Sequence, residues 1–184
     1  FSSLMKIITL LAAFLVLIIS SNYLKTFLIF KIEYPILILS SVLGMMIMIN
    51  SNDLIVFYMG LELQSLALYV LATFNRDQIK SSEAGLKYFV LSALSSGLLL
   101  YGCSLIYGFT GSTNFNVIAN QLNSNEYALT FGIVFILVGL SFKISAVPFH
   151  MWAPDVYEGS PTSVTLFFTM VPKIAALTVF IRFL

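Results

Sequence analysis

Charged residues are scarce in this chain: Asp, Glu, Lys and Arg together make up 9% of its 184 residues. An ordinary soluble domain carries about 25% charged residues, so that class is excluded. Hydrophobic residues account for 59% of the chain instead, which is typical of an integral membrane protein with almost no soluble part. The formal net charge of +1 is too small to indicate nucleic-acid binding.

Cysteine and histidine, which form disulfides and ligate metals, are almost absent. Cys103 is the only cysteine and His150 the only histidine, which excludes an internal disulfide and a Cys/His metal cluster. The sequence also has no glycine-rich nucleotide loop after a strand and no cysteine set for an iron–sulfur cluster. We therefore expect no cofactor and no redox site in this chain.

The chain consists instead of long apolar runs. A helix rises 1.5 Å per residue, so about 20 apolar residues cross a bilayer. The runs predict an all-α, polytopic transmembrane bundle of about six spans, and a short interfacial helix over Phe115 to Leu122. The predicted spans are Leu4 to Ser21, Tyr34 to Asn50, Leu54 to Phe74, Ser82 to Tyr107, Tyr127 to Tyr157 and Thr162 to Leu184.

The basic residues of the connections predict the orientation of the bundle. Lys25 and Lys31 follow the first span, and Arg76 and Lys80 follow the third. The connections after the second and fourth spans contain no Lys or Arg. Because basic loops stay on the cytoplasmic or matrix side, the first and third connections are expected on that inner side, together with the fifth.

The fifth span carries a lysine and a proline where the membrane should continue. Proline removes a backbone donor and clashes with the preceding turn, so Pro148 predicts irregular backbone between about Ile144 and Pro148. Broken helices at membrane depth occur where they are buried in protein or line a wet cavity. Lys143 beside such a break is therefore a candidate functional residue. The alternative is a lysine that snorkels from a helix that simply ends at Pro148.

Other ionisable residues have similar depths on neighbouring spans. Counting along the helices places Glu62 roughly 12 Å and Lys173 roughly 16 Å into the core, with Lys87 roughly 7 Å deep. Lys143 lies roughly 24 Å along its longer, broken span, and His150 follows two residues after Pro148. Because burial and neighbouring charges act in opposite directions on a buried lysine, these five residues are candidates for a proton relay.

The relay hypothesis predicts a specific arrangement. Glu62 and Lys143 should approach each other, directly or through one side chain or water, with Lys173 next along the same polar line. Structural alternatives stay open: Glu62 and a lysine could form a fixed ion pair, Lys87 could be an anchor at the inner face, and His150 could be packed within the protein.

Four stretches carry a resemblance to a known family. They are GLELQSLALYVLATF (Gly60 to Phe74), SSEAGLKYFVLSALSSGLLLYGCSLIYGFTG (Ser81 to Gly111), FKISAVPFHMWAPDVYEGSPTSVT (Phe142 to Thr165) and PKIAAL (Pro172 to Leu177). Together they resemble the antiporter-like subunits of proton-pumping NADH:quinone oxidoreductase, respiratory complex I, and in particular the subunit 2 group, called N-type in bacteria.

The resemblance implies an organisation for the chain. Members have inverted five-helix repeats, each with a broken helix. By this resemblance, residues 1–33 are a leading transmembrane helix with its connecting loop, and residues 34–184 are the first repeat. Glu62, Lys87, Lys143, His150 and Lys173 match the family's buried glutamate, its buried lysines and the histidine past the break. The second repeat is absent from this sequence and is expected on another polypeptide or on a missing part of the chain.

The resemblance also implies a function. The chain would be a proton-translocating subunit of the membrane arm that couples NADH:ubiquinone electron transfer to proton pumping. NADH, FMN, iron–sulfur clusters and ubiquinone would bind other subunits. Expected partners are the lipid bilayer and the other membrane-arm subunits, including a chain with the second repeat. The alternatives are a subunit of a multisubunit cation/proton antiporter and a non-conducting scaffold. A composition rich in Ile, Phe, Asn and Lys favours a mitochondrial inner membrane over a bacterial plasma membrane.

Overall fold

A computed structural model describes residues 1–26, 31–121 and 127–183 of the chain. In this part the chain forms eight α-helices and no strand beyond one isolated bridge. The helices are α1 (Ser2–Thr26), α2 (Glu33–Asn50), α3 (Leu54–Ala72), α4 (Ile79–Thr110), α5 (Phe115–Gln121), α6 (Tyr127–Ile144), α7 (Trp152–Gly159) and α8 (Thr162–Phe183).

The helix lengths confirm the predicted all-α membrane bundle. Among the described residues, five helices are long and apolar enough to cross a membrane, namely α1, α2, α3, α4 and α8. The predicted fifth span is built from two pieces, because the apolar helix that ends at Ile144 is shorter and α7 follows it after a break. The predicted short helix is α5; its last predicted residue, Leu122, and the final Leu184 lie outside the described residues.

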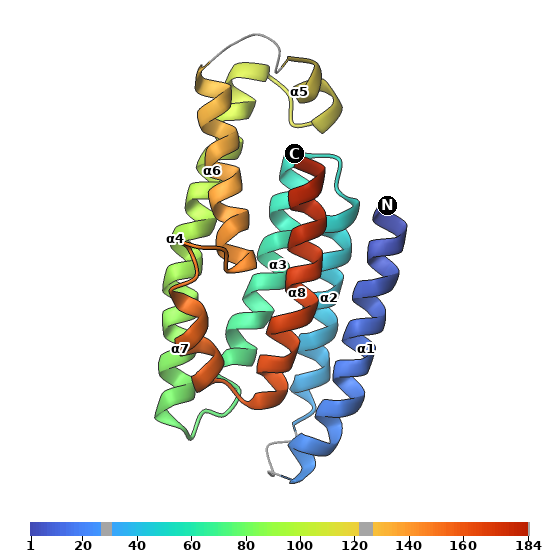
Figure 1. Ribbon diagram of the computed structural model, residues 1–184, viewed down its shortest axis with the longest axis vertical. Helices are drawn as coiled ribbons and strands as arrows, with labels where there is room; N and C mark the ends of the chain where they lie inside the picture. The colour runs from blue at the N-terminus through green and yellow to red at the C-terminus, as the bar shows by residue number, and fades with distance from the viewer. Residues whose placement is uncertain (27–30, 122–126, 184) are drawn as a thin grey trace.

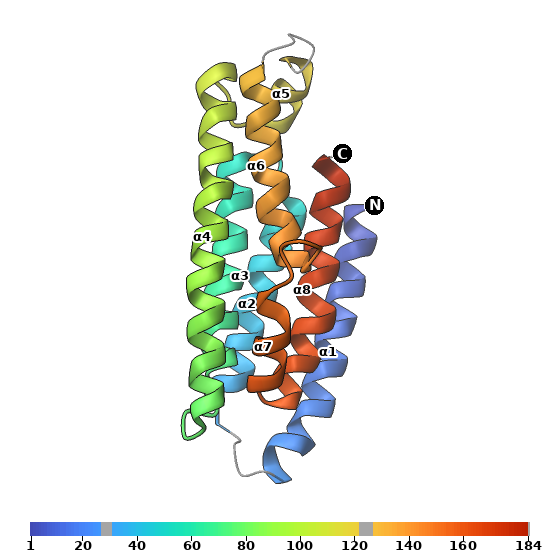
Figure 2. The same cartoon turned by 60° about the vertical axis from the view of Figure 1, so that its left-hand side comes forward.

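The helices lie side by side with α6 and α7 end to end. Both views show α6 and α7 stacked along the length of α4, whereas α1 lies at the far edge of the bundle (Figures 1 and 2). α1 packs on α8 and α2, and α8 also contacts α6, α2 and α3. The turns after α3 and α7 lie at one end of the bundle (Figure 1). This is the end that the basic connections predict to be the inner side.

Glycine pairs let neighbouring helices approach closely. A Cβ added to Gly60 of α3 would lie 2.8 Å from the Met48 nitrogen and 2.9 Å from the Gly44 carbonyl oxygen of α2. A Cβ added to Gly102 of α4 would lie 2.7 Å from the carbonyl oxygen of Gly132 on α6. Membrane helices associate through such small-residue contacts because lipid provides no hydrophobic force between them. These contacts fix α3 against α2 and α6 against α4.

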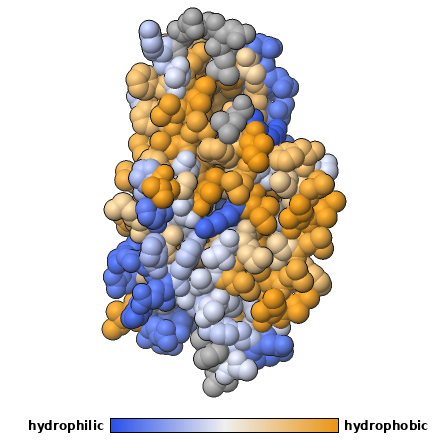
Figure 3. All heavy atoms as spheres, viewed as in Figure 1, coloured by the Kyte–Doolittle hydropathy of each residue, from blue (hydrophilic) through white to orange (hydrophobic). Residues whose placement is uncertain are grey.

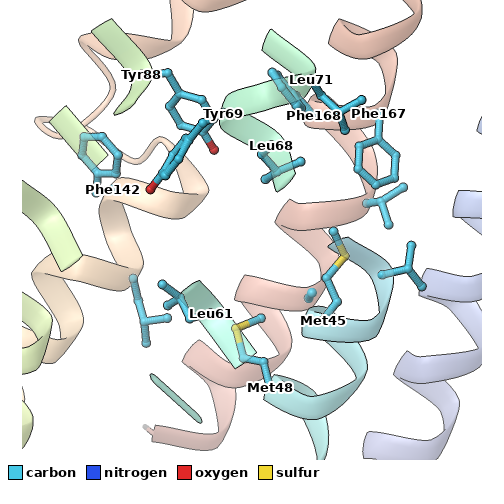
Figure 4. Close-up of a cluster of buried hydrophobic side chains, with 14 of the residues drawn as sticks. Met45, Met48, Leu61, Leu68, Tyr69, Leu71, Tyr88, Phe142, Phe167 and Phe168 are labelled. Atoms are coloured by element: carbon cyan, nitrogen blue, oxygen red, sulfur yellow. The ribbon is translucent and has the colours of Figure 1, made fainter. Parts of the chain in front are cut away.

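The core lies between α2, α3 and α8. Methionine side chains of α2 and leucine side chains of α3 meet the phenyl rings of α8 there (Figure 4). Met45, Met48, Leu61, Leu68 and Phe167 are each at most 1% exposed. Long apolar side chains fill the space that the glycine contacts leave, so α3 is held firmly on one side while its opposite face points toward α4 and α6.

Charged residues gather where α7 meets the start of α4. Lys87 Nζ lies 2.7 Å from an oxygen of Asp155, and Lys80 Nζ lies 3.0 Å from an oxygen of Glu158. The face shown in Figure 3 is hydrophilic over this region, at the lower left, and mostly hydrophobic over α1, at the right. Two ion pairs therefore connect the second piece of the broken span to α4.

Candidate functional site

The break in the fifth span is confirmed and is longer than predicted. α6 ends at Ile144 and α7 begins at Trp152, so the intervening seven residues leave the helical path. Ser145 has a φ of 59°, a left-handed conformation that is uncommon for a residue other than glycine. The Trp152 Nε1–H donates a hydrogen bond to the carbonyl of Phe142 at 3.0 Å. The tryptophan thus satisfies a carbonyl at the end of α6 and ties α7 back to α6.

Lys143 lies in the last turn of α6, directly before this break. Its side chain is only 6% exposed. The ammonium nitrogen Nζ donates to Ser65 Oγ of α3 at 2.8 Å and to Ser92 Oγ of α4 at 2.5 Å. A cation in the last turn also interacts favourably with the helix dipole. Lys143 of α6 therefore connects α3 and α4 through its hydrogen bonds.

Further hydroxyl groups extend this contact. The Tyr69 hydroxyl donates to Ser92 Oγ at 2.7 Å, and the Ser65 hydroxyl donates to the Leu61 carbonyl at 2.6 Å. Nζ of Lys143 lies 5.8 Å from the centre of the Tyr69 ring. Figure 4 shows the Tyr69 hydroxyl turned toward Phe142, the residue before the lysine. The surroundings of Lys143 are thus neutral hydroxyls and an aromatic ring.

Glu62 does not form an ion pair with Lys143. In the described part of the chain, the ion pairs within 4.0 Å involve Lys80 and Lys87. Glu62 lies one turn before Ser65 on α3 and is half-buried, and its Oε1 has no hydrogen-bond partner among the described residues. Its charge still interacts electrostatically with Lys143. Ser65 therefore makes the direct contact with Lys143 on α3, and the approach of Glu62 through one side chain or water stays a prediction.

Lys173 contacts α7 rather than Lys143. It follows Pro172 within α8 and is half-buried. Its Nζ lies 5.5 Å from the centre of the Tyr157 ring. The Tyr157 ring packs on Trp152 at 5.9 Å, and Trp152 packs on Phe142 at 5.5 Å. A row of aromatic rings thus connects the surroundings of Lys173 to the end of α6.

Two of the predicted residues lie away from this site. Lys87 is not buried in the described bundle: its side chain is 44% exposed and pairs with Glu83 and Asp155. α4 has 32 residues and is therefore about 48 Å long, well beyond a ~30 Å core, so the depth of Lys87 in the membrane stays a prediction. His150 is exposed within the break.

Ser65, Ser92 and Tyr69 were not predicted from the sequence. For α3 a signal exists, because Ser65 and Tyr69 follow Glu62 at positions i+3 and i+7 and share its helical face. For α4 none exists, because Ser92, Ser95 and Ser96 are too close together to show which one faces α6.

Together these features define a class of protein. Membrane-length helices, one of them broken, enclose a buried lysine at the break, which is the architecture of membrane proteins that move ions or protons. The comparison with known families agrees with this class. Residues 51–184 match the family described as "NADH:quinone oxidoreductase/Mrp antiporter, TM", and the chain belongs to this family.

Individual relatives in this family are bacterial. The chain is 80% identical over 183 residues to NADH-quinone oxidoreductase subunit N of Pelagibacter ubique, covering 100% of this chain and 39% of that protein. It is 60% identical over 184 residues to subunit N of Bartonella bacilliformis, covering 99% and 38%. The chain thus spans about two fifths of the length of these relatives. The expected mitochondrial location, which rested on composition alone, is not supported.

Solved structures share the fold. A chain of respiratory complex I from Thermus thermophilus superposes with a TM-score of 0.83 at 34% identity, covering 98% of this chain and 39% of that one. A chain of the Mrp complex from Dietzia gives a TM-score of 0.69 at 28% identity, covering 80% and 29%. A helix bundle similar to this one therefore occurs in both assemblies.

Proposed function

We propose that this chain is part of a subunit N of bacterial respiratory complex I, in the plasma membrane, and that it takes part in proton translocation driven by quinone reduction. The name of the 80% identical relative supports the subunit assignment, and the complex I structure supports the fold of the membrane arm. In this proposal Glu62, Lys143 and Lys173 exchange protons.

One observation carries this proposal: Lys143 is buried at a helix break and its hydrogen-bond partners are neutral hydroxyls. A lysine in direct contact with a carboxylate is held in its charged form. Hydroxyl partners accept from an ammonium group but also tolerate a neutral amine. Lys143 therefore has the surroundings of a group that gains and loses a proton.

Glu62 supplies the electrostatic control in this proposal. Its carboxylate lies one turn from Ser65 and interacts with Lys143 without contacting it. A charged Glu62 favours the ammonium form of Lys143, and a protonated Glu62 releases that preference. Protonation of the glutamate would thus promote proton release from the lysine, and Lys173 on α8 would be the next group to respond.

The remaining sequence expectations belong to the same proposal. NADH, FMN, iron–sulfur clusters and ubiquinone would bind other subunits, and neighbouring membrane-arm chains would surround this one. A second five-helix repeat would complete the path. The role of His150 in the relay stays a prediction, whereas the exposed ion pairs of Lys87 favour the anchor interpretation for that residue.

Two substitutions in the intact complex test the relay. Glu62→Gln keeps the volume and an acceptor but cannot be charged, and Lys143→Met removes the titratable amine. We expect both complexes to assemble and to lose proton translocation in proteoliposomes, normalised to assembled complex, while Lys80→Gln behaves like the parent. Lys143→Arg should not restore pumping because arginine does not release its proton. Normal pumping by both variants would exclude the relay and leave only a structural role for the charges of Glu62 and Lys143.

A cation/proton antiporter is the second candidate, because the family and the Mrp complex structure include such proteins by name. The difference between 80% identity to subunit N and 28% identity to the Mrp chain favours the first candidate. Copurification separates them: NADH-oxidising and iron–sulfur subunits accompany a complex I subunit and do not accompany an antiporter. A scaffold would show lost assembly instead of lost pumping in the two variants.

A further inference from the structure

The two serines that bind Lys143 differ in what their own protons do. The Ser65 hydroxyl donates to the Leu61 carbonyl at 2.6 Å, so its oxygen faces Lys143 as an acceptor only. Ser92 Oγ accepts from Tyr69 at 2.7 Å and from Lys143 at 2.5 Å. Among the described residues, no carbonyl takes the proton of Ser92, so the hydrogen bond between the Ser92 and Tyr69 hydroxyls can run in either direction. Ser65 therefore has a fixed hydrogen-bond direction, and Ser92 does not.

This difference matters because the two forms of lysine need different partners. An ammonium group has three donors and no acceptor, whereas a neutral amine has two donors and one lone pair. Ser65 accepts an N–H from either form. Ser92 accepts an N–H from the ammonium form, and rotation about its Cβ–Oγ bond lets it donate to the lone pair of the amine. Tyr69 can donate to Ser92 in both arrangements.

We propose that Ser92 is a positioning residue that keeps Lys143 hydrogen-bonded in both protonation states; this inference rests on the function proposed above. The proton leaves Nζ through the third N–H, which neither serine occupies, and passes to the next acceptor of the relay. The O–H bond of Ser92 stays intact: the hydroxyl rotates about Cβ–Oγ, and the amine rotates about Cε–Nζ so that its lone pair faces Ser92. Without this rotation, the lone pair of the buried amine would have no donor, and an unpaired buried polar group is unfavourable.

The charged and titratable neighbours cannot take this role. On α3, Glu62 favours only the ammonium form, and the Tyr69 hydroxyl is engaged with Ser92. On α4, Tyr88 packs against the Tyr69 ring at 5.1 Å. On α8, Lys173 is directed to the Tyr157 ring. Ser92 is thus the neighbour that can both accept from Lys143 and donate to it.

Four variants of the intact complex test the proposal by proton translocation across pH, normalised to assembled complex. Ser92→Ala should lower the rate roughly tenfold or more and should move the pH optimum less than Ser65→Ala does, because both forms of Lys143 lose a partner. Ser92→Thr keeps the hydroxyl and should restore the rate. Ser65→Ala should shift the optimum to lower pH, because ammonium loses more than amine when an acceptor is removed.

The matched control is Ser96→Ala, whose hydroxyl donates to the Ala93 carbonyl of its own helix at 3.2 Å; it should behave like the parent. The proposal is overturned if Ser92→Ala pumps normally or shifts the optimum as far as Ser65→Ala does. If Lys143→Met abolishes pumping while Ser92→Ala does not change it, only the role of Ser92 is wrong. Normal pumping by Lys143→Met would overturn the relay itself.

A second feature lies at the inner end of α2 and α3. A groove of about 280 Å³ opens there between the start of α2 and the end of α3. Its wall is largely apolar, and Ile36 and Val70 are 58% and 51% exposed along it. Lys31 and Arg76 lie at its rim. The groove thus has a basic end at the predicted inner surface and an apolar body toward the bilayer core.

The two rim cations differ from the other inner-face lysines. Lys80 and Lys87 have carboxylates within 4.0 Å, whereas Lys31 and Arg76 have none among the described residues. Glu33 lies in the same groove, so its lining carries one positive charge more than negative. Basic pockets between membrane helices on the cytoplasmic side bind anionic lipid headgroups. We infer that this groove binds an anionic glycerophospholipid, its phosphate near Lys31 and Arg76 and an acyl chain along Val70.

Photoactivatable phosphatidylglycerol and phosphatidylcholine with identical acyl chains test this site in the reconstituted complex, with labelled peptides identified by mass spectrometry. Phosphatidylglycerol should label the α2–α3 groove, and Lys31→Gln combined with Arg76→Gln should reduce that labelling about tenfold, with Lys80→Gln as the unchanged control. Equal labelling by both lipids would overturn the headgroup selectivity. Absence of lipid labelling in the intact complex would show that a protein neighbour covers the groove.

Discussion

Lys87 Nζ of α4 lies 2.7 Å from Asp155 Oδ2 of α7, and it lies 2.8 Å from Glu83 Oε1 of its own helix. This ion pair connects the second piece of the broken span to the start of α4, where Lys80 and Glu158 form another. Lys87 thus belongs to the charged inner end of the bundle, away from the buried hydroxyls around Lys143.

We therefore predict that neutralising Lys87 has little effect on pumping. Lys87→Gln should cause a small loss of thermal stability that is absent at high salt, because exposed ion pairs are weak and screened. Proton translocation per assembled complex should stay close to that of the parent. Complete loss of pumping by the assembled variant would instead support a relay role for Lys87.

The close approach of α2 and α3 gives a prediction about packing. In Gly60→Ala the new Cβ would lie 2.8 Å from a backbone nitrogen of α2, and neither backbone can move away without disturbing the core. We expect a loss of about 1–3 kcal/mol in stability, measured as a lower thermal midpoint of the solubilised complex and less assembled complex on native gels.

Gly97→Ala of α4 is the matched control, because nothing lies within 4 Å of its added Cβ. It should be neutral or slightly stabilising, since alanine favours a helix more than glycine does. Equal destabilisation by both variants would indicate that helix propensity or membrane insertion, and not the contact between α2 and α3, determines the effect.

The connection at the opposite end of the bundle gives a prediction about pH. Asp53 caps α3 by accepting from the backbone N–H of Ile55 at 2.8 Å, and it also accepts from the Thr113 hydroxyl. The Thr113 hydrogen bond, followed by those of the Ile55 and Val56 backbone, holds the pKa of Asp53 below its ordinary value despite partial burial. The ionised carboxylate therefore stabilises the fold above pH about 3.8.

That stabilisation is lost as the pH falls through the lowered pKa of Asp53. Asp53→Asn should keep the cap, because asparagine is a good N-cap residue, and should remove this part of the acid dependence of the thermal midpoint. Asp53→Ala should be less stable at every pH, by about 1 kcal/mol. An unchanged acid dependence in Asp53→Asn would show that other carboxylates determine it.

The elements that the sequence predicted well are those with a strong local cause. Apolar runs of membrane length predicted the helices, and Pro148, shortly after Lys143, predicted the break. Both effects depend on residues that are close in the sequence. The break extends to Met151 because the chain must reposition Trp152 over the end of α6, which is a tertiary contact. The alternation of the spans also predicted that the turns after α3 and α7 lie at one end of the bundle, whereas the assignment of that end to the inner side stays a prediction.

The contacts of the site could not be predicted in the same way. Position along a helix gives depth, but it does not give the face that a side chain occupies, so the ion pairs of Lys87 and the contact of Ser92 with Lys143 were not predicted. The pair formed by Glu83 and Lys87 at i, i+4 was visible in the sequence and indicated an exposed face. The choice of Ser65 over Glu62 as partner of Lys143 depends on how α6 sits against α3, which only the folded bundle determines.

Trp152 gives the last prediction, because it is the side chain that holds the break together. Its Nε1–H donates to the Phe142 carbonyl at 3.0 Å, and its ring stacks on Tyr88 with centroids 4.7 Å apart. Trp152→Phe keeps an aromatic ring but removes one of the two donors to the carbonyl of Phe142, which also accepts from the Ser145 backbone N–H at 3.0 Å. The loss of one hydrogen bond costs about 0.5–1.5 kcal/mol, so the thermal midpoint should fall.

The same substitution should also slow proton translocation per assembled complex, because Phe142 precedes Lys143 and a looser end of α6 displaces Nζ from the two serines. Tyr157→Phe is the control on the same short helix: it removes a hydroxyl that has no partner among the described residues and keeps the ring under Lys173. It should leave stability and pumping unchanged. If Trp152→Phe lowers the thermal midpoint but pumps like the parent, the hydrogen bond stabilises the break without positioning Lys143.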